Sequence, residues 1–318
     1  MRKMMIVLAA LPFAACSDGV TFDLTSTMEA QTRGVAMFNW NDQGVAGMLD
    51  QTCSFDIAEG RVLGDLVDLP GTDDRVVDGD GAQALVTSGG DVWSVSDWGE
   101  TFALSTPGSV LDAAFTRDGV ATLTGSADGC AVHFADGSET SVGLAGVDCL
   151  SASLESTRSS DFVFVADGSS VVRVDHGTTL EIERGADLMS YDDGASVLVI
   201  ANSNGSDIRG LDANGVTDWT VTVDGTVDSL DAMGWERFTV VSFTTPGGNS
   251  EIVVLNSGNG DVHGQVEVPA TVEVTASPDG ATVALDDGGA VHFYDVNPRN
   301  AVLGAPSVQP QTQPTFGD

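Results

Sequence analysis

The strongest constraint on this sequence is a repeat with a period of about 40 residues. Short valine-rich runs are separated by turns in which glycine lies beside aspartate, asparagine or serine. Each unit consists of an apolar strand, a turn ending in Asp-Gly or a related pair, a second strand, a polar turn and a third strand. No long segment has the 3.6-residue period of an amphipathic helix. The sequence therefore predicts an all-β chain built from repeats.

Seven third strands can be recognised, because each ends in a large apolar residue. These residues are Phe55, Val95, Phe134, Val174, Leu211, Leu255 and Tyr294. Four short strands in about 40 residues is the pattern of a propeller blade. We therefore predict a seven-bladed β-propeller of four-stranded antiparallel blades.

The seventh repeat lacks a well-specified fourth strand, because a Pro/Gln-rich tail follows Tyr294 soon afterwards. The strand-like segment 20–25 precedes the first blade, where a fourth strand is needed. We predict that this N-terminal strand pairs beside the strand 290–294 and closes the propeller, which removes an open sheet edge. Segment 301–303 is the competing candidate for that edge.

The first fifteen residues have the layout of an export signal, with positive charge at 2–3, an apolar run at 4–13 and two alanines before Cys16. The apolar run is too short to span a bilayer as a helix. Phe13-Ala14-Ala15-Cys16 resembles a bacterial lipobox, although leucine is usual at the phenylalanine position. The resemblance implies that Cys16 becomes the acylated first residue, and Ser17 after it implies the outer membrane. The alternative is simple secretion with cleavage nearby.

These features divide the chain into four parts. Residues 1–15 are the expected lipoprotein signal peptide, and residues 16–19 are a lipid-anchored linker. The propeller is expected to cover residues 20–304. A disordered Pro/Gln-rich tail is expected over residues 305–318.

Charge limits the partners of the chain. It has 47 acidic and 12 basic residues, a net charge of −35, and removal of Arg2 and Lys3 with the signal leaves −37. Such a surface repels nucleic acid and anionic lipid headgroups. We therefore expect no nucleic acid partner, membrane attachment through the lipid anchor only, and a monomer. The partner is expected to be an unidentified envelope protein, on the periplasmic or the surface side.

Several repeats resemble those of bacterial propellers with quinoprotein-like, YVTN-like or WD-like repeats. Asp212-Ala213-Asn214-Gly215 followed by Trp219 is similar to the quinoprotein-type repeat, with one residue fewer in the turn. Ser277-Pro278-Asp279-Gly280 resembles the turn common in YVTN-like and WD-like blades. The resemblance implies the fold and no particular activity.

Two of the cysteines are placed where neighbouring blades meet. Cys130 opens the third strand of the third blade, and Cys149 lies near the entry of the first strand of the fourth blade. A disulfide between them would close a loop of about 20 residues and stabilise the chain by roughly 3 kcal/mol. The alternative is two separate buried thiols. Cys53 occupies the position in the first blade equivalent to Cys130 and is expected to lie outside the bridge.

Two glycine-rich turns carry clustered carboxylates, which is how an oxygen-ligated calcium site can begin. The four candidate ligands are Asp78, Asp80, Asp286 and Asp287. Neither turn matches a full calcium loop, and solvated turns are the favoured interpretation. The spacing of the four histidines does not indicate zinc, so we expect no cofactor except weakly bound calcium.

The sequence favours binding over catalysis. It has no nucleophile elbow, no catalytic-cysteine signature and no adjacent cysteine pair of the kind that quinoprotein dehydrogenases use. Trp40, Trp98 and Trp235 lie at or beside turns and are candidate partner contacts, whereas Trp93 and Trp219 are expected to pack within blades. The leading hypothesis is a non-catalytic envelope lipoprotein that acts as a protein-binding or scaffold propeller. The alternatives are a metal-dependent hydrolase or lactonase using channel carboxylates, and an adhesin-like surface protein.

Overall fold

The computed structural model of the chain describes residues 5–7, 22–38, 43–47, 52–67, 74–96, 101–104, 108–126, 129–135, 140–156, 159, 161–232, 237–268 and 273–296. These residues form strands and turns, and none of them lies in a helix. Within this part of the chain, no helix has the length and apolarity needed to cross a membrane. The predicted all-β class is confirmed.

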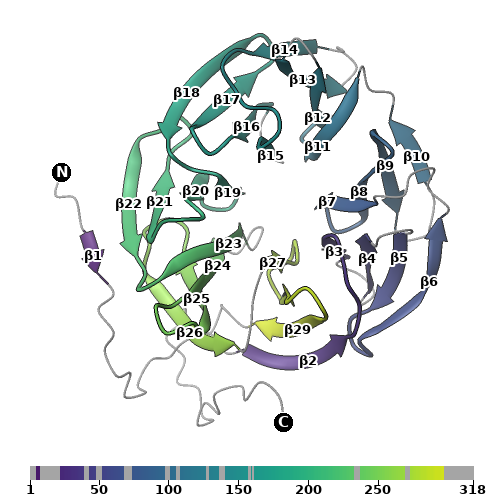
Figure 1. Cartoon of the computed structure of the whole chain (residues 1–318), viewed down its shortest axis with the longest axis vertical. Coiled ribbons are helices and arrows are strands. Elements are labelled where there is room, and N and C mark those ends of the chain that lie inside the picture. Colours follow the sequence, from purple (N-terminus) through teal and green to yellow (C-terminus); the bar gives the residue numbers. More distant parts are fainter. Residues whose placement is uncertain are drawn as a thin grey trace. The chain divides into compact units, whose positions relative to one another are not determined.

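The strands form seven four-stranded blades, and the chain is a seven-bladed β-propeller as predicted (Figure 1). Two compact units, 28–187 and 1–27 with 188–318, are described separately below. The first unit holds blade 1 (β3 Val35–Met37, β4 Gln43–Gly47, β5 Thr52–Asp56, β6 Arg61–Val67), blade 2 (β7 Arg75–Gly79, β8 Gln83–Ser88, β9 Asp91–Ser96, β10 Thr101–Leu104), blade 3 (β11 Ser109–Thr116, β12 Gly119–Ser126, β13 Gly129–Ala135, β14 Thr140–Leu144) and blade 4 (β15 Ser153–Ser156, β16 Val163–Ala166, β17 Ser170–Asp175, β18 Thr178–Arg184). The second unit holds blade 5 (β19 Leu188–Asp192, β20 Val197–Ala201, β21 Asp207–Leu211, β22 Thr217–Thr222), blade 6 (β23 Thr226–Ala232, β24 Phe238–Thr244, β25 Ser250–Asn256, β26 Val262–Val268) and blade 7 (β27 Glu273–Ala276, β28 Thr282–Asp286, β29 Val291–Val296) with β2 (Phe22–Met28).

The large apolar residues that mark the repeat all lie in third strands. They are Phe55, Val95, Phe134, Val174, Leu211, Leu255 and Tyr294, and each is at most 2% exposed. The period in the sequence is therefore the period of the blades. One fully buried residue at the same place in every blade explains why the repeat can be read from the sequence.

The middle strands of blade 6 are buried on both faces, because this blade packs against blade 5 on one side and blade 7 on the other. In β24 of blade 6, Val240 packs toward blade 7, whereas Val241 packs toward blade 5. In β25, Val254 packs toward blade 7 and Leu255 packs toward blade 5. Successive residues of a strand point to opposite faces, so a continuous apolar run serves two cores.

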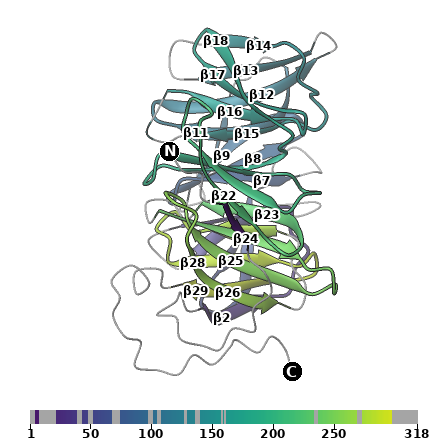
Figure 2. The same cartoon turned by 90° about the vertical axis from the view of Figure 1, so that its left-hand side faces the viewer.

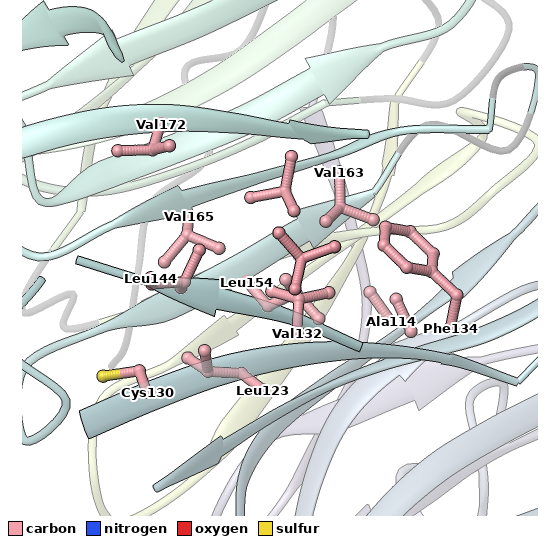
Figure 3. Packing of buried hydrophobic residues seen from close by; sticks show 13 residues of the cluster. Ala114, Leu123, Cys130, Val132, Phe134, Leu144, Leu154, Val163, Val165 and Val172 are labelled. Atoms are coloured by element: carbon pink, nitrogen blue, oxygen red, sulfur yellow. The ribbon is translucent and has the colours of Figure 1, made fainter. Parts of the chain in front are cut away.

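In the first unit, blades 3 and 4 lie side by side, and Figures 1 and 2 both show their strands together. Figure 3 shows the cluster of buried side chains between them. Blade 3 contributes Leu123, Val132 and Phe134, and blade 4 contributes Leu154 and Val163. The core thus lies between sheets, and a blade without its neighbours would expose these side chains to water.

The predicted closing strand is present as β2, and residues 20 and 21 of the predicted segment lie outside the described residues. β2 lies next to β29 and completes blade 7 as its fourth strand. The side chain of Thr27 contacts β29, because its Oγ1 atom lies 3.0 Å from His292 Nδ1. A further strand, β1 (Met5–Val7), pairs in parallel with β22 of blade 5. β1 lies within the expected export signal. Blade 5 has its four strands, β19 to β22, without β1.

Side chains of first strands also connect neighbouring blades within each unit. In the first unit, Asp78 Oδ2 accepts a hydrogen bond from the Phe115 N–H group (2.7 Å), and Asp112 Oδ2 accepts one from Leu154 (2.8 Å). In the second unit the same kind of bond joins Ser190 to Ala232, Ser229 to Val274 and Asp231 to Ala276. A β-bulge directly precedes Asp78, Asp112 and Ser229 and changes the direction of the strand there.

Candidate functional site

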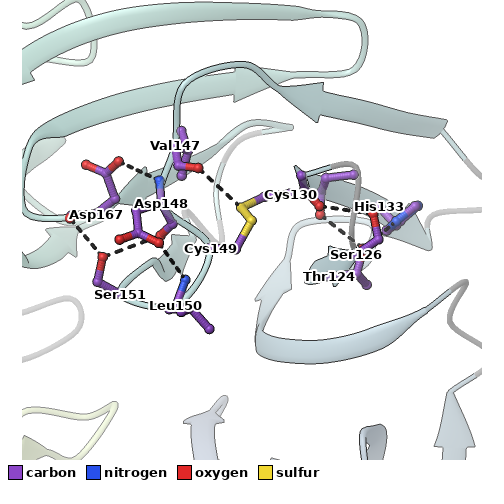
Figure 4. Close-up of a disulfide and its surroundings, with 12 residues drawn as sticks. Thr124, Ser126, Cys130, His133, Val147, Asp148, Cys149, Leu150, Ser151 and Asp167 are labelled. Carbon is purple, nitrogen blue, oxygen red and sulfur yellow. Dashed lines mark hydrogen bonds between the residues drawn. A yellow bond between two sulfur atoms is a disulfide. The ribbon is translucent and has the colours of Figure 1, made fainter.

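A disulfide fixes the connection between blades 3 and 4 (Figure 4). Cys130 in β13 is bonded to Cys149 in the loop 145–152, with 2.02 Å between the sulfur atoms and 5.5 Å between the Cα atoms. The bond joins the two residues for which the sequence suggested a bridge. Cys53 lies outside this bridge and is buried in β5. A disulfide here ties the loop to the third strand of the preceding blade.

A set of hydrogen bonds holds the same loop against blade 4. The Asp148 N–H group donates to Asp167 Oδ2 (2.9 Å), and the Ser151 hydroxyl donates to the Asp167 carbonyl (3.1 Å). Burial would raise the pKa of Asp167, but the bonds it accepts from Asp148, Ser169 and Ser170 outweigh burial and hold the pKa below its usual value. Asp167 is therefore a charged acceptor that organises the loop.

The loop presents Leu150 to solvent. Leu150 is 95% exposed, and Figure 4 shows its side chain pointing away from Asp167. Its N–H group donates to Asp148 Oδ1 (3.1 Å), so its backbone takes part in the turn. The fixed backbone and the uncovered apolar side chain together make this loop the candidate binding site.

The sequence did not indicate Leu150, because one leucine between cysteine and serine has no periodic pattern. The available signal was its position directly after Cys149. A bridge at Cys149 anchors the neighbouring backbone, but only the structure shows that the next side chain is uncovered.

The two calcium-ligand candidates of blade 2 both accept hydrogen bonds from backbone N–H groups. Asp78 accepts from Gly79 through Oδ1 and from Phe115 through Oδ2. Asp80 Oδ1 accepts from Ala82 and Gln83, at 2.8 and 2.6 Å. These bonds give Asp78 a role between blades and give Asp80 a role in its own turn.

The two candidates of blade 7 have similar roles. Asp286 Oδ1 accepts from Gly288 (2.7 Å), and Asp287 Oδ1 accepts from Gly289 and Ala290. The pKa of Asp287 is lowered, because these backbone bonds and His292 outweigh its burial. Among the residues that the structure describes, no group of three or more histidine, cysteine, aspartate or glutamate side chains is arranged to hold a metal ion. Calcium binding and the metal-dependent hydrolase remain hypotheses from the sequence.

Two carboxyl groups that the sequence did not single out have raised pKa values. Burial raises the pKa of Asp112 to about 6, against the lowering effects of the Leu154 N–H group and Arg75. Burial likewise raises the pKa of Asp192 to about 6, against the hydrogen bonds of Ser257 and Ala195. Both groups lie in first strands, where neighbouring sheets exclude water.

The remaining candidates are distributed as follows. Cys16, Trp40, Trp98, Trp235 and the segment 301–303 lie outside the described residues. Trp219 is buried, and its Nε1–H group donates to the Ser257 carbonyl (2.7 Å), so its predicted role in blade packing agrees with the structure. Trp93 packs against the cluster shared by blades 1 and 2.

Comparisons with known proteins identify the fold alone. No protein-family model matches the sequence, and no curated protein matches it. The solved β-propeller domain of Cps50 (Swd1) from Myceliophteria thermophila is similar, with 14% identity, a TM-score of 0.65, and coverage of 87% of this chain and 100% of that domain. A chain of the mitotic checkpoint complex is also similar, with 14% identity, a TM-score of 0.64, and coverage of 91% and 98%. These structures support the β-propeller fold.

Proposed function

We propose that this chain is a non-catalytic, protein-binding propeller displayed on the bacterial cell envelope as a lipoprotein. The observation that carries the proposal is the loop 145–152, which a disulfide and the Asp167 bonds hold while Leu150 stays 95% exposed. Propellers suit such a role, because packed sheets fix the positions of the loops between them.

Export is supported by two independent features. The N-terminal segment has the layout of an export signal, and a Cys130–Cys149 disulfide persists only where thiols are kept oxidised. The envelope outside the inner membrane is such a compartment. Acylation at Cys16 would then tether the propeller to the membrane, most simply to the outer membrane because Ser17 follows the cysteine.

The charge of the chain favours a protein as its partner. With a net charge of −35, the surface repels both nucleic acid and anionic lipid. A protein that offers basic residues would be attracted instead. The lipid anchor would therefore provide the contact with the membrane, and the propeller would provide the contact with the partner.

The anchor can be tested by feeding cells a clickable fatty acid. We expect the parent chain and the Ser17→Ala control to be labelled, and Cys16→Ser to lose the label. Equal labelling of Cys16→Ser and the parent would disprove the anchor.

The scaffold role can be tested on envelopes solubilised in mild detergent. Lysine-directed crosslinkers are unsuitable, because Lys3 is the only lysine and lies in the expected signal. We expect the chain, which has a mass of 32.7 kDa, to migrate on native gels in a larger assembly that contains a second polypeptide. Migration as an isolated chain in several detergents would contradict the proposal.

A further inference from the structure

The loop 145–152 is longer than its connection requires. It joins the last strand of blade 3, which ends at Leu144, to the first strand of blade 4, which begins at Ser153. The equivalent connections 185–187 and 223–225 cross from one blade to the next in three residues each. The connection 145–152 has eight residues, and the connection 68–74 between blades 1 and 2 has seven. The loop 145–152 is therefore five residues longer than the shortest connections. Loops of this kind are where binding residues concentrate.

The backbone on both sides of Leu150 is fixed. Cys149 is bonded to β13, and the Ser151 N–H group donates to the Asp148 carbonyl (3.3 Å). The Asp148 N–H group is held by Asp167. A partner that binds this loop would therefore lose little additional conformational entropy, and such preorganisation strengthens binding.

Leu150 differs from the other exposed large apolar side chains. Its exposure of 95% compares with 39–58% for the rest of that group, which is Leu24, Leu63, Leu180 and Val216. Each of those four is therefore about half covered in the folded chain, whereas folding covers almost nothing of Leu150. Burial of a complete leucine side chain by a partner would tighten Kd by roughly 10- to 100-fold.

The surroundings of Leu150 favour a basic partner. The described segment 140–156 contains Asp148 and Glu155 and has no lysine or arginine. A second copy of this chain would bring the same charge of −35, and an anionic membrane would be repelled. Opposite charge around an apolar anchor is the complementary arrangement.

We propose that Leu150 is the anchor of a protein-binding surface, and that the partner receives it in an apolar pocket bordered by arginine or lysine. This inference rests on the proposed function, because it names the partner chemistry of the same loop. Asp148 provides charge beside the anchor, and the disulfide holds the anchor in place. The surface is therefore small, rigid and selective for a cationic rim.

The test places a photocrosslinking amino acid at position 150 of the full chain in intact cells, with position 216 as the matched control on an exposed turn. We expect a discrete adduct from position 150 and none from position 216. Mass spectrometry should identify the attached peptide as part of a second protein with lysine or arginine beside it. An adduct with another copy of this chain, or with lipid only, would overturn the inference.

Substitutions provide an independent measurement on native gels of the assembly. Because the side chain is 95% exposed, Leu150→Asp is expected to fold normally. It should weaken the complex at least 10-fold, whereas Leu150→Met should retain it. An assembly unchanged by Leu150→Asp would refute the role of this loop and leave the scaffold proposal standing. Absence of any assembly for the parent would refute the scaffold proposal itself.

Discussion

Asp112 places a carboxyl group between two blades, where its charge and its hydrogen bonds have opposite effects. The carboxylate accepts the Leu154 N–H group of the next blade, yet burial raises its pKa to about 6. The ordinary value is 3.8. Between these values the folded chain holds a proton that the unfolded chain has released. The folded state therefore gains stability as the pH falls through 6 toward 4, and it loses that gain as the pH rises.

This linkage predicts a measurable pH dependence. From pH 7 to pH 5, Asp112 should increase the free energy of unfolding by roughly 1 kcal/mol. Asp112→Asn has no proton to bind, so its difference between the two pH values should be smaller than that of the parent by about that amount. Urea unfolding of both proteins at pH 5 and pH 7 provides the comparison. Identical pH profiles would show that Asp112 does not titrate in this range.

Gly210 is a strand glycine whose missing side chain makes space for Trp219. A Cβ atom at position 210 would lie 2.2 Å from Trp219 Nε1, whereas one at Gly143 would meet no atom within 4 Å. We expect Gly210→Ala to destabilise the chain by roughly 1–3 kcal/mol through overpacking. Gly143→Ala, also in a strand, should be nearly neutral. Unfolding free energies in urea would decide, and equal values for the two variants would contradict this packing of the indole.

At the scale of elements, the closing strand β2 is held to β29 by a side-chain contact as well as by its place in the sheet. Thr27 Oγ1 lies 3.0 Å from His292 Nδ1, and His292 Nε2 lies 3.4 Å from Asp287 Oδ2. Thr27→Val keeps the shape of the side chain and removes the hydroxyl. We expect a loss of about 1 kcal/mol and faster amide exchange in β2.

Thr25 provides the matched control, because it is exposed on the same strand. Thr25→Val should leave amide exchange in β2 unchanged. Hydrogen exchange followed by mass spectrometry of the N-terminal peptide would measure both variants. If the amides of β2 exchange at the same rate in the Thr25→Val and Thr27→Val variants, the contact between Thr27 and His292 has no part in closure.

The blades could be predicted because their signal is local. A large buried apolar residue lies at the same place in each repeat, as Phe134 does in blade 3, and turn residues mark where strands end. The bonds between blades could not be predicted, because they depend on which backbone N–H group of a neighbouring sheet faces the side chain. Asp78 illustrates this limit: its sequence context favoured a solvated turn with calcium binding as the alternative, whereas its Oδ2 atom accepts a hydrogen bond from the N–H group of Phe115, 37 residues away. Only the register of two sheets brings those groups together.

The candidate site likewise has one part that the sequence predicts and one part that it does not. The positions of Cys130 and Cys149 in the repeat indicated that a bridge could form, since the repeat places both residues near one junction between blades. The importance of Leu150 depends on the path of eight loop residues, and no strand or turn pattern determines that path. Trp219 was predicted to pack within a blade because it lies in a strand pattern, and it is buried there.

At the scale of the whole molecule, the excess of acidic over basic residues should make stability depend on salt. With 47 acidic and 12 basic residues, the chain has a large excess of negative charges that repel one another. Folding brings these charges closer together and so increases the repulsion. Raising NaCl from about 0.1 to about 1 M shortens the screening length from about 10 to about 3 Å. We expect Tm to rise by roughly 5 °C over this range and then to level off.

Adding calcium distinguishes general screening of the acidic surface from binding at a specific calcium site. The four candidate aspartates, Asp78, Asp80, Asp286 and Asp287, already accept bonds from backbone N–H groups. Binding an ion would require these oxygens to bind the metal as well, and the carboxylates are divided between blade 2 and blade 7. In about 0.5 M NaCl, where general screening is nearly complete, micromolar calcium should therefore leave Tm unchanged. A saturable rise in Tm under those conditions, abolished by Asp78→Asn or Asp286→Asn, would instead establish a specific calcium site and reopen the hydrolase hypothesis.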